Sequence, residues 1–94
     1  MNSPKIKTKM EEAAGKLVSA IQKEWNKEIG ESSSDNSLDV MDLAHDFLRA
    51  KSAENMRNIL ESKTIKQYLG IGWVEDHPSV QPYIDKLEQA IYNE

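Results

Sequence analysis

Histidine, serine and carboxylate side chains at short spacing are the groups that could perform acid–base or nucleophilic chemistry. The segment VEDHPS brings four of them together, namely Glu75, Asp76, His77 and Ser79, and His45 is the only other histidine of the chain. Closeness in sequence is not convergence in space, and no motif joins either histidine to a nucleophile. We expect Asp76 and His77 to set a turn before the following proline. We therefore predict no catalytic residue and no enzyme activity.

A second cluster invites comparison with a calcium site. The segment DNSLDVMDLAHD, residues 35–46, carries four aspartates. An EF-hand loop needs oxygen ligands at alternate positions, a glycine at its sixth position and a bidentate glutamate at its twelfth. Here those two positions hold Val40 and Asp46. The spacing instead indicates a helix with a solvated acidic face formed by Asp39, Asp42 and Asp46, and we predict no metal site.

The chain lacks the motifs that hold cofactors. The GIG of residues 70–72 has no third glycine, no preceding strand and no phosphate-facing helix start, so it is not a dinucleotide fingerprint. There is no P-loop. The absence of cysteine removes disulfides, thiolate zinc sites and cysteine nucleophiles. We predict no cofactor.

The stretch LGIGWVEDHPSVQPYI, residues 69–84, is typical of a corner between helices. Its glycines can adopt positive φ, which ends a helix and turns the chain. With Ser79 as N-cap, Pro82 becomes the third helical residue, where a missing N–H costs nothing. Trp73 is the largest apolar group at the corner, and we expect it to be mostly buried. The predicted corner residues are Gly70, Gly72, Trp73, Pro78 and Pro82.

The same stretch supports an alternative. TIKQYLGI is similar to the first helix of a helix-turn-helix motif, and PSVQPYIDKLEQA is similar to a recognition helix of a winged-helix domain. This resemblance implies a DNA-binding transcriptional regulator. The sequence departs from it because eight residues, GWVEDHPS, intervene where the motif has three or four. The last helix also has only Lys86 as a basic residue, with no arginine to read guanine.

Composition predicts one small globular domain over residues 1–94. The chain is 38% hydrophobic and 30% charged, an ordinary balance for a folded domain of this size. The N-terminal segment MNSPKIKTKMEEAAGK has no signal-peptide core, and no apolar run approaches the roughly 20 residues of a membrane span. With cysteine absent as well, we expect a cytoplasmic protein with no membrane partner.

Charge is unevenly distributed. The net charge of -4 divides into +2 for residues 1–30, from six Lys and four Glu, and -6 for residues 31–94, from six basic and twelve acidic groups. Phosphate neutralisation needs a basic face, so an acidic body argues against general binding of DNA or RNA. We expect nucleic acid not to be a partner.

A long amphipathic helix is predicted over about residues 4–29. Ser3 and Pro4 suit its N-cap and first position, and Gly30 suits its end. Apolar residues recur on one face. At 1.5 Å per residue the helix would be about 39 Å long, which exceeds the roughly 30 Å diameter of a domain of this size.

Shorter helices could not cover so long a stripe, and this suggests self-association. A two-fold contact with a second copy would cover the exposed part on both chains. We therefore predict a homodimer. An alternative is that the helix breaks near Gly15 and folds back. The predicted self-association residues are Leu17, Ile21, Trp25 and Ile29.

The rest of the chain is predicted to be helical. The polar run ESSSDNS, about residues 31–37, is expected to be a flexible linker. A helical body over about residues 38–92 follows, and no segment alternates as a strand would. The fold class is therefore all-α, a small bundle of four to five helices with a long N-terminal helix.

These observations favour a non-catalytic protein. We expect a protein–protein interaction or regulatory protein that presents amphipathic helix faces, self-associates and binds a protein partner whose identity the sequence does not give. A related possibility is that the acidic face of Asp39, Asp42 and Asp46 occupies a basic, nucleic-acid-binding surface of the partner. The alternative of a different class is the helix-turn-helix regulator.

Overall fold

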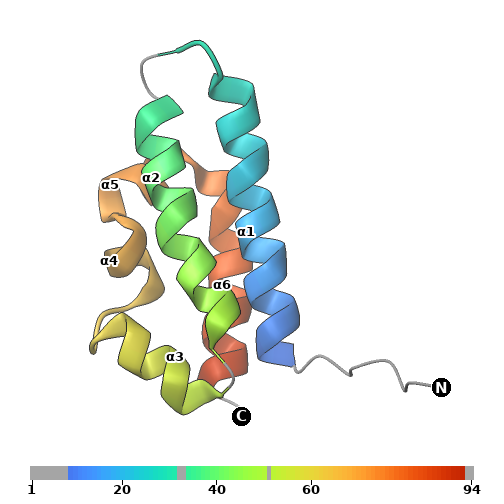
Figure 1. Ribbon diagram of the computed structural model, residues 1–94, viewed down its shortest axis with the longest axis vertical. Helices are drawn as coiled ribbons and strands as arrows, with labels where there is room; N and C mark the ends of the chain where they lie inside the picture. The colour runs from blue at the N-terminus through green and yellow to red at the C-terminus, as the bar shows by residue number, and fades with distance from the viewer. Residues whose placement is uncertain (1–8, 32–33, 51, 93–94) are drawn as a thin grey trace, which may run out of the picture.

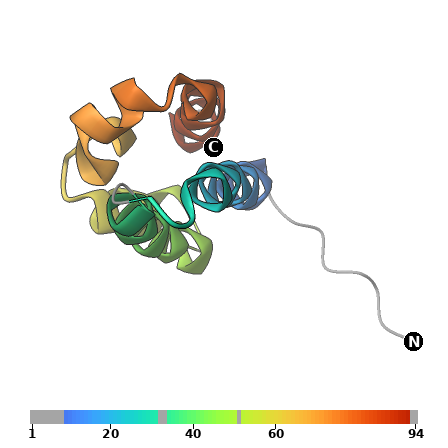
Figure 2. The same cartoon turned by 90° about the horizontal axis from the view of Figure 1, so that it is seen from above.

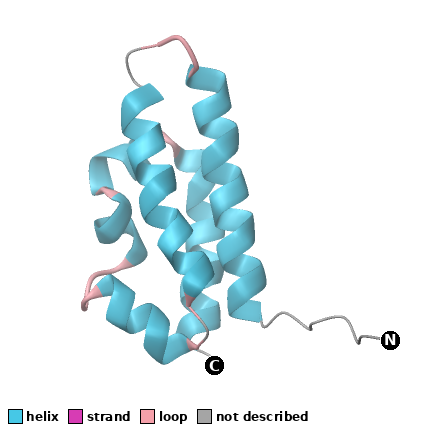
Figure 3. Cartoon of the chain, viewed as in Figure 1, coloured by secondary structure: helices cyan, strands magenta, loops and turns pink. Residues whose placement is uncertain are grey.

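The predicted all-α fold is confirmed. The computed structural model describes residues 9–31, 34–50 and 52–92, and this part of the chain holds helices and loops without any strand (Figure 3). Six α-helices occur in it, rather than four or five, because the stretch 53–69 forms two helices and residues 71–76 form a further short one. The elements are α1 (Lys9–Glu28), α2 (Ser34–His45), η1 (Asp46–Arg49), α3 (Ala53–Leu60), α4 (Ile65–Leu69), α5 (Ile71–Asp76), η2 (Pro78–Val80) and α6 (Gln81–Tyr92).

Three long helices form the frame of the bundle. α1 and α2 run side by side in opposite directions, and α6 returns along α1 on its other flank (Figure 1). The short helices α3, α4 and α5 connect α2 to α6 and close the side of the bundle away from α1 (Figure 2). α1 is therefore the helix that both α2 and α6 cover.

α1 is continuous, so the alternative of a break near Gly15 is wrong. A Cβ added at Gly15 would meet no atom within 4 Å, and the helix passes through it without interruption. The described helix has 20 residues, about 30 Å at 1.5 Å per residue. The predicted residues 4–8 lie outside the described part of the chain. A helix of that length needs no second copy to cover it, because α2 and α6 run along it.

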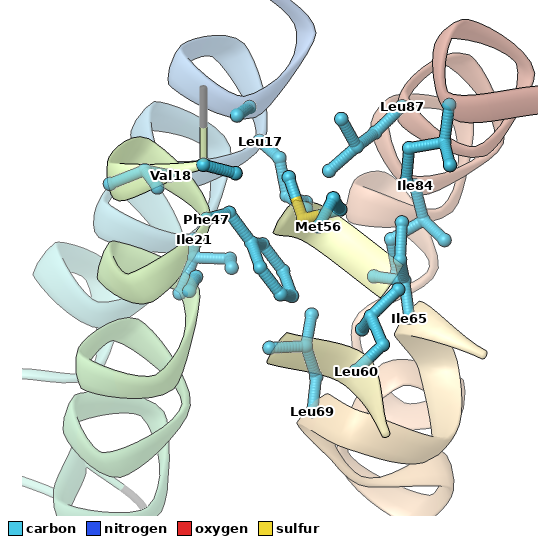
Figure 4. Close-up of a cluster of buried hydrophobic side chains, with 14 of the residues drawn as sticks. Leu17, Val18, Ile21, Phe47, Met56, Leu60, Ile65, Leu69, Ile84 and Leu87 are labelled. Atoms are coloured by element: carbon cyan, nitrogen blue, oxygen red, sulfur yellow. The ribbon is translucent and has the colours of Figure 1, made fainter. Parts of the chain in front are cut away.

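Two of the predicted self-association residues lie in the core instead. Leu17 and Ile21 are fully buried because the apolar stripe of α1 faces α2 and α6 of the same chain. Met10, Ala14 and Val18 complete the buried stripe. Figure 4 shows the cluster they enter, in which Phe47 lies between the α1 side chains and a second group formed by Leu60, Ile65, Leu69, Ile84 and Leu87.

The boundary between α1 and α2 is shorter than the expected linker. α2 begins at Ser34, so the last residues of the run 31–37 are helical, and residues 32–33 lie outside the described part. Ser37 is fully buried. The burial of Ser37 shows that this polar run contributes to the packing of the bundle.

Side-chain caps fix the short helices. The Ser52 hydroxyl accepts a hydrogen bond from the Asn55 backbone N–H at the start of α3. Thr64 and Gln67 form a capping box at the start of α4, with the two hydrogen bonds at 3.1 and 2.9 Å. Such caps satisfy N–H groups that a helix leaves unpaired. They make helices of five to eight residues possible here.

The predicted corner is present, with a different start for the last helix. Gly70 has φ of 112°, a value that favours glycine, and it joins α4 directly to α5. Gly72 has no positive φ and lies inside α5. Pro78 opens the 3-10 turn η2, so the chain resumes helical structure there and not after Ser79. Pro82 is the second residue of α6, where its missing N–H is harmless.

Candidate functional site

A closed ring of hydrogen bonds joins three segments at one end of the bundle. The Trp73 indole N–H donates to the Ser37 hydroxyl at 2.9 Å, and Ser37 donates to Oε1 of Glu28. The other carboxylate oxygen of Glu28 accepts from Nε2 of His77 at 2.6 Å. Nδ1 of His77 donates to the backbone carbonyl of Trp73 at 2.7 Å, which closes the ring. We call these four residues the Glu28 network.

The partners of His77 define its protonation state. A backbone carbonyl can only accept, and a carboxylate accepts as well. Both ring nitrogens of His77 therefore carry protons, so the side chain is an imidazolium paired with a carboxylate. The side chains are 11% and 16% exposed, respectively. A pair so far removed from water is held more firmly than a surface ion pair.

The pKa values of the pair move apart. Hydrogen bonds from Ser37 and then from His77 lower the pKa of Glu28 from its ordinary value, against a smaller effect of burial, and the charge of His77 adds to the lowering. Burial opposes the charged form of His77. The hydrogen bonds to Glu28 and to the Trp73 carbonyl, with the charges of Glu28 and Glu24, outweigh it and raise the pKa of His77. Each partner keeps the other ionised.

The network contains serine, histidine and glutamate without the geometry of a catalytic triad. In a triad the serine hydroxyl bonds to the histidine, which acts as its base. Here Ser37 bonds to the carboxylate instead, is fully buried, and accepts from Trp73. His77 has no unprotonated nitrogen to accept a proton. The arrangement is therefore suited to holding helices together.

Trp73 lies at the predicted corner with only a minority of its surface exposed. It packs against the core and stacks on the ring of His77 with centroids 4.1 Å apart and planes at 17°. The prediction that it is mostly buried is confirmed, and the core and the His77 ring supply the covering contacts. Its place at the corner is as predicted. One edge remains accessible from the space between α2 and α5.

That space is a groove with an apolar floor and an acidic rim. Its volume is about 350 Å³. Val40 and Leu69 are buried, Leu43 is 36% exposed, and all three line it with Trp73. Polar side chains complete the lining, namely Asn36, Asp39, Asp76 and His77. We call it the α2–α5 groove.

The predicted acidic face continues from this groove along α2. Asp39 and Asp42 are exposed. Asp46 lies in η1 and is partly used inside the chain, since it accepts from the Tyr68 hydroxyl at 3.2 Å and lies 3.8 Å from Arg49. The face is therefore open at its first two residues and internally paired at the third.

Apolar side chains are exposed on the same helix. Leu38 is 37% exposed and Leu43 is 36% exposed, one on each side of the aspartates. Single exposed apolar residues are ordinary on a protein surface, so these leucines matter only through their place beside the aspartates and the groove. The other predicted self-association residues lie elsewhere. Trp25 is half-buried on α1, and Ile29, just after α1, is 61% exposed.

The candidate recognition helix of the alternative prediction is a core helix. Val80, Ile84, Leu87 and Ile91 are buried, and α6 packs against α1. Its exposed face carries Asp85 beside Lys86, and Asp85 accepts a hydrogen bond from Gln81 at 2.8 Å. This surface carries little positive charge to contact the phosphates that line a DNA groove.

Glu28 and Ser37 are absent from the residues predicted from the sequence, although their spacing carries a signal. Glu28 follows Ile21 by two helical turns, in the register of the buried stripe of α1. Ser37 precedes Val40, Ala44 and Phe47, all buried, at the spacing of their shared face. A polar residue at a core position of each of two adjacent helices indicates a pair of partners.

The described residues hold no group of three histidine, cysteine, aspartate or glutamate side chains that could bind a metal ion. Within the same residues, no helix has both the length and the apolar character that crossing a membrane requires. Comparisons with protein-family models, with curated proteins and with solved structures found no match for this chain.

Proposed function

We propose that this is a non-catalytic interaction protein that binds a basic, amphipathic segment of a partner protein at the α2–α5 groove. The observation that carries the proposal is the composition of that groove. It combines an apolar floor with acidic side chains at its rim, next to exposed leucines on α2. A helix that alternates leucine with lysine or arginine complements such a surface.

The apolar floor provides a place for one or two side chains. Leu43 and Trp73 are the partly open residues there, and Leu69 and Val40 support them from below. Partly exposed aromatic and aliphatic groups in a depression are the kind that anchor a partner. The Glu28 network fixes the position of Trp73 through its hydrogen bond to Ser37. The floor is therefore preorganised, which lowers the entropic cost of binding.

The rim selects the charge of the partner. Asp39 and Asp76 are exposed and line the groove, and His77 has its charge balanced by Glu28. Asp42 extends the negative charge along α2. Exposed ion pairs each contribute only about 0.2–1 kcal/mol, so we expect charge to steer and orient the partner and the apolar floor to retain it.

Two further properties, self-association and cellular compartment, belong to the same proposal. We propose that the protein also self-associates, since Ile29 at the end of α1 and the leucines of α2 are exposed. We propose the cytoplasm as its compartment, in keeping with the absence of cysteine.

A pair of designed peptides tests the groove. One is a helical peptide of leucine and lysine, and the other replaces every lysine by glutamate. Titration of isotope-labelled protein, followed by NMR, is expected to show saturable binding of the lysine peptide, with shifts at Leu43 and Trp73, and none for the glutamate peptide.

Matched variants locate the interaction. Leu43→Asp is expected to abolish binding, and Asp39→Asn with Asp76→Asn to weaken it. Asp85→Asn, on the exposed face of α6, makes the same type of charge change away from the groove and is expected to leave binding unchanged. Equal binding of both peptides, or no effect of Leu43→Asp in a folded protein, would refute the proposal.

A further inference from the structure

Lysines form a stripe along the outer face of α1. Lys9, Lys16 and Lys23 follow one another at intervals of seven residues, and Lys27 follows four residues later. Seven residues turn an α-helix by about 700°, within about 20° of two full turns, so these side chains share one face. All four are exposed. Their face is turned away from the buried stripe that begins at Met10.

Most of this stripe has no ion-pair partner in the described part of the chain. Lys9, Lys16 and Lys23 form no ion pair among the described residues, whereas Lys27 lies 3.1 Å from Glu24. Unpaired charges that line up along a helix create a local positive field in a protein of net charge -4.

A groove between α1 and α6 extends the positive surface. It has a volume of about 690 Å³, and Lys16, Lys23 and, from α6, Lys86 line it together with Ala20 and Tyr83. Glu11 and Glu12 line the end nearest the start of α1. We call it the α1–α6 groove. Its lining comes from α1 and α6 and shares no residue with the lining of the α2–α5 groove. α1 and α6 lie apart from α5 in the bundle (Figure 2).

The acidic residues of α2 and η1 repeat the spacing of the lysines. Asp35, Asp42 and Asp46 are separated by seven and then four residues, as are Lys16, Lys23 and Lys27. Two parallel helices laid side by side can therefore bring Asp35 and Asp42 against Lys16 and Lys23, at an interval of about 10.5 Å. Asp46 and Lys27 already have partners within the chain. Leu38 and Leu43 flank the aspartates.

We infer that the basic partner of this acidic face is a second copy of the chain, whose α1–α6 groove receives α2 of the first. The inference rests on the proposed function, because it names the partner of the α2 face. The half-buried Ala20 and Tyr83 would meet the exposed leucines, and the lysines would meet the aspartates.

The two surfaces are different, so the contact is heterologous. After one contact forms, the first copy keeps its basic surface free and the second keeps its acidic surface free, and such contacts build rings or open chains of subunits. This assembly differs from a two-fold dimer centred on Leu17 and Ile21, which are buried. Because exposed charges carry much of it, the association is weak and sensitive to salt.

Paired charge reversals test the inference. One variant carries Lys16→Glu with Lys23→Glu, and the other carries Asp35→Lys with Asp42→Lys, each at exposed positions seven residues apart. Sedimentation equilibrium of the full chain at low salt is expected to show association for the wild type and none for either variant alone. An equimolar mixture of the two variants restores association, because each reversed surface then meets its complement.

Controls separate charge pairing from net charge and from misfolding. Glu54→Lys with Asp85→Lys changes the net charge as much as the aspartate variant, at exposed positions on α3 and α6, and is expected to associate like the wild type. Asp42→Lys alone is the substitute if the double variant loses its helical circular dichroism. The apparent dissociation constant of the wild type is expected to rise about tenfold or more between low salt and about 1 M, where the screening length falls to about 3 Å.

The outcomes distinguish this inference from the proposed function. Wild-type protein that stays monomeric at low salt, or folded variants that stay monomeric when mixed, would overturn the inference. If the lysine peptide still binds at Leu43 and Trp73 in that case, the proposed function stands with a different partner. If the peptide fails as well, both are wrong.

Discussion

The imidazole of His77 lies 2.6 Å from the carboxylate of Glu28, a residue 49 positions earlier in the chain. The contact connects the last turn of α1 to the residue between α5 and η2. Ser37 binds the second oxygen of the same carboxylate, so the start of α2 is attached to the same point. One carboxylate thus holds together three segments that are distant in sequence.

Stability is expected to depend on pH through this pair. His77 has a raised pKa in the folded protein, so its contribution is complete below its ordinary pKa of 6.5 and is lost as the pH rises through the folded value. Glu28 has a lowered pKa, so its contribution is complete above its ordinary pKa of 4.5 and is lost as the pH falls through the folded value. The melting temperature should therefore be highest between these two ordinary values.

Thermal melts from acid to mildly alkaline pH check this expectation. His77→Gln should flatten the alkaline side of the profile, and Glu28→Gln should flatten both sides, since it also removes the partner of His77. A wild-type melting temperature that does not fall above neutral pH would show that His77 is not held as an imidazolium.

Two substitutions at Trp73 separate its hydrogen bond from its packing. Trp73→Phe keeps an aromatic ring against His77 and removes the donor to Ser37, which should cost about 1 kcal/mol of unfolding free energy. Trp73→Ala also removes the packing and should cost about 3 kcal/mol. Urea denaturation followed by circular dichroism measures both. Equal losses for the two variants would assign the whole effect to the hydrogen bond.

The exposed and buried residues of the α1 stripe should respond differently to truncation. Leu17 is fully buried, and Leu17→Ala should cost about 3 kcal/mol because it leaves a cavity. Ile29 is 61% exposed, and Ile29→Ala should change the free energy of unfolding by no more than about 0.5 kcal/mol. Chemical denaturation compares them. A large loss at Ile29 in dilute protein would place that residue in the core.

Duplex DNA should not bind at physiological salt. The exposed face of α6 places Lys86 directly beside Asp85, which leaves few contacts for phosphates. A gel-shift titration with random-sequence and genomic duplexes measures this. A sequence-selective complex that weakens steeply with salt and is lost on Lys86→Ala would instead support the helix-turn-helix alternative.

The apolar stripe of α1 shows what hydrophobic periodicity can predict. Apolar spacing placed Leu17 and Ile21 on one face of a long helix, and the structure has them there. It did not show that α6 covers them, because coverage depends on contacts between helices from opposite parts of the chain. We predicted that the shorter helices could not cover the apolar stripe of residues 4–29. That prediction assumed that a single shorter helix would have to be as long as this helix to cover it.

The polar network was harder to predict for a physical reason. Glu28 and Ser37 each look like ordinary helix-end residues, since acidic, hydroxyl and amide side chains favour turns and caps. Their partners, Trp73 and His77, lie in a segment rich in glycine and proline. Those turn residues are enough to account for the segment's composition, so nothing in it suggests a contact with a distant part of the chain. Only the register of Glu28 and Ser37 with their buried neighbours distinguishes them. The groove beside Trp73 could be predicted from neither pattern, because it depends on how α5 is placed against α2.

The position of α6 beside α1 has a consequence for how the chain folds during synthesis. α1 and α2 can pair as soon as both have left the ribosome, because they are neighbours in sequence. α6 contacts α1 and is made last among the described helices, so its contacts close a long loop. Until then the nascent chain exposes the flank of α1 that α6 later covers. We expect this intermediate to be the species most prone to aggregation or to capture by chaperones.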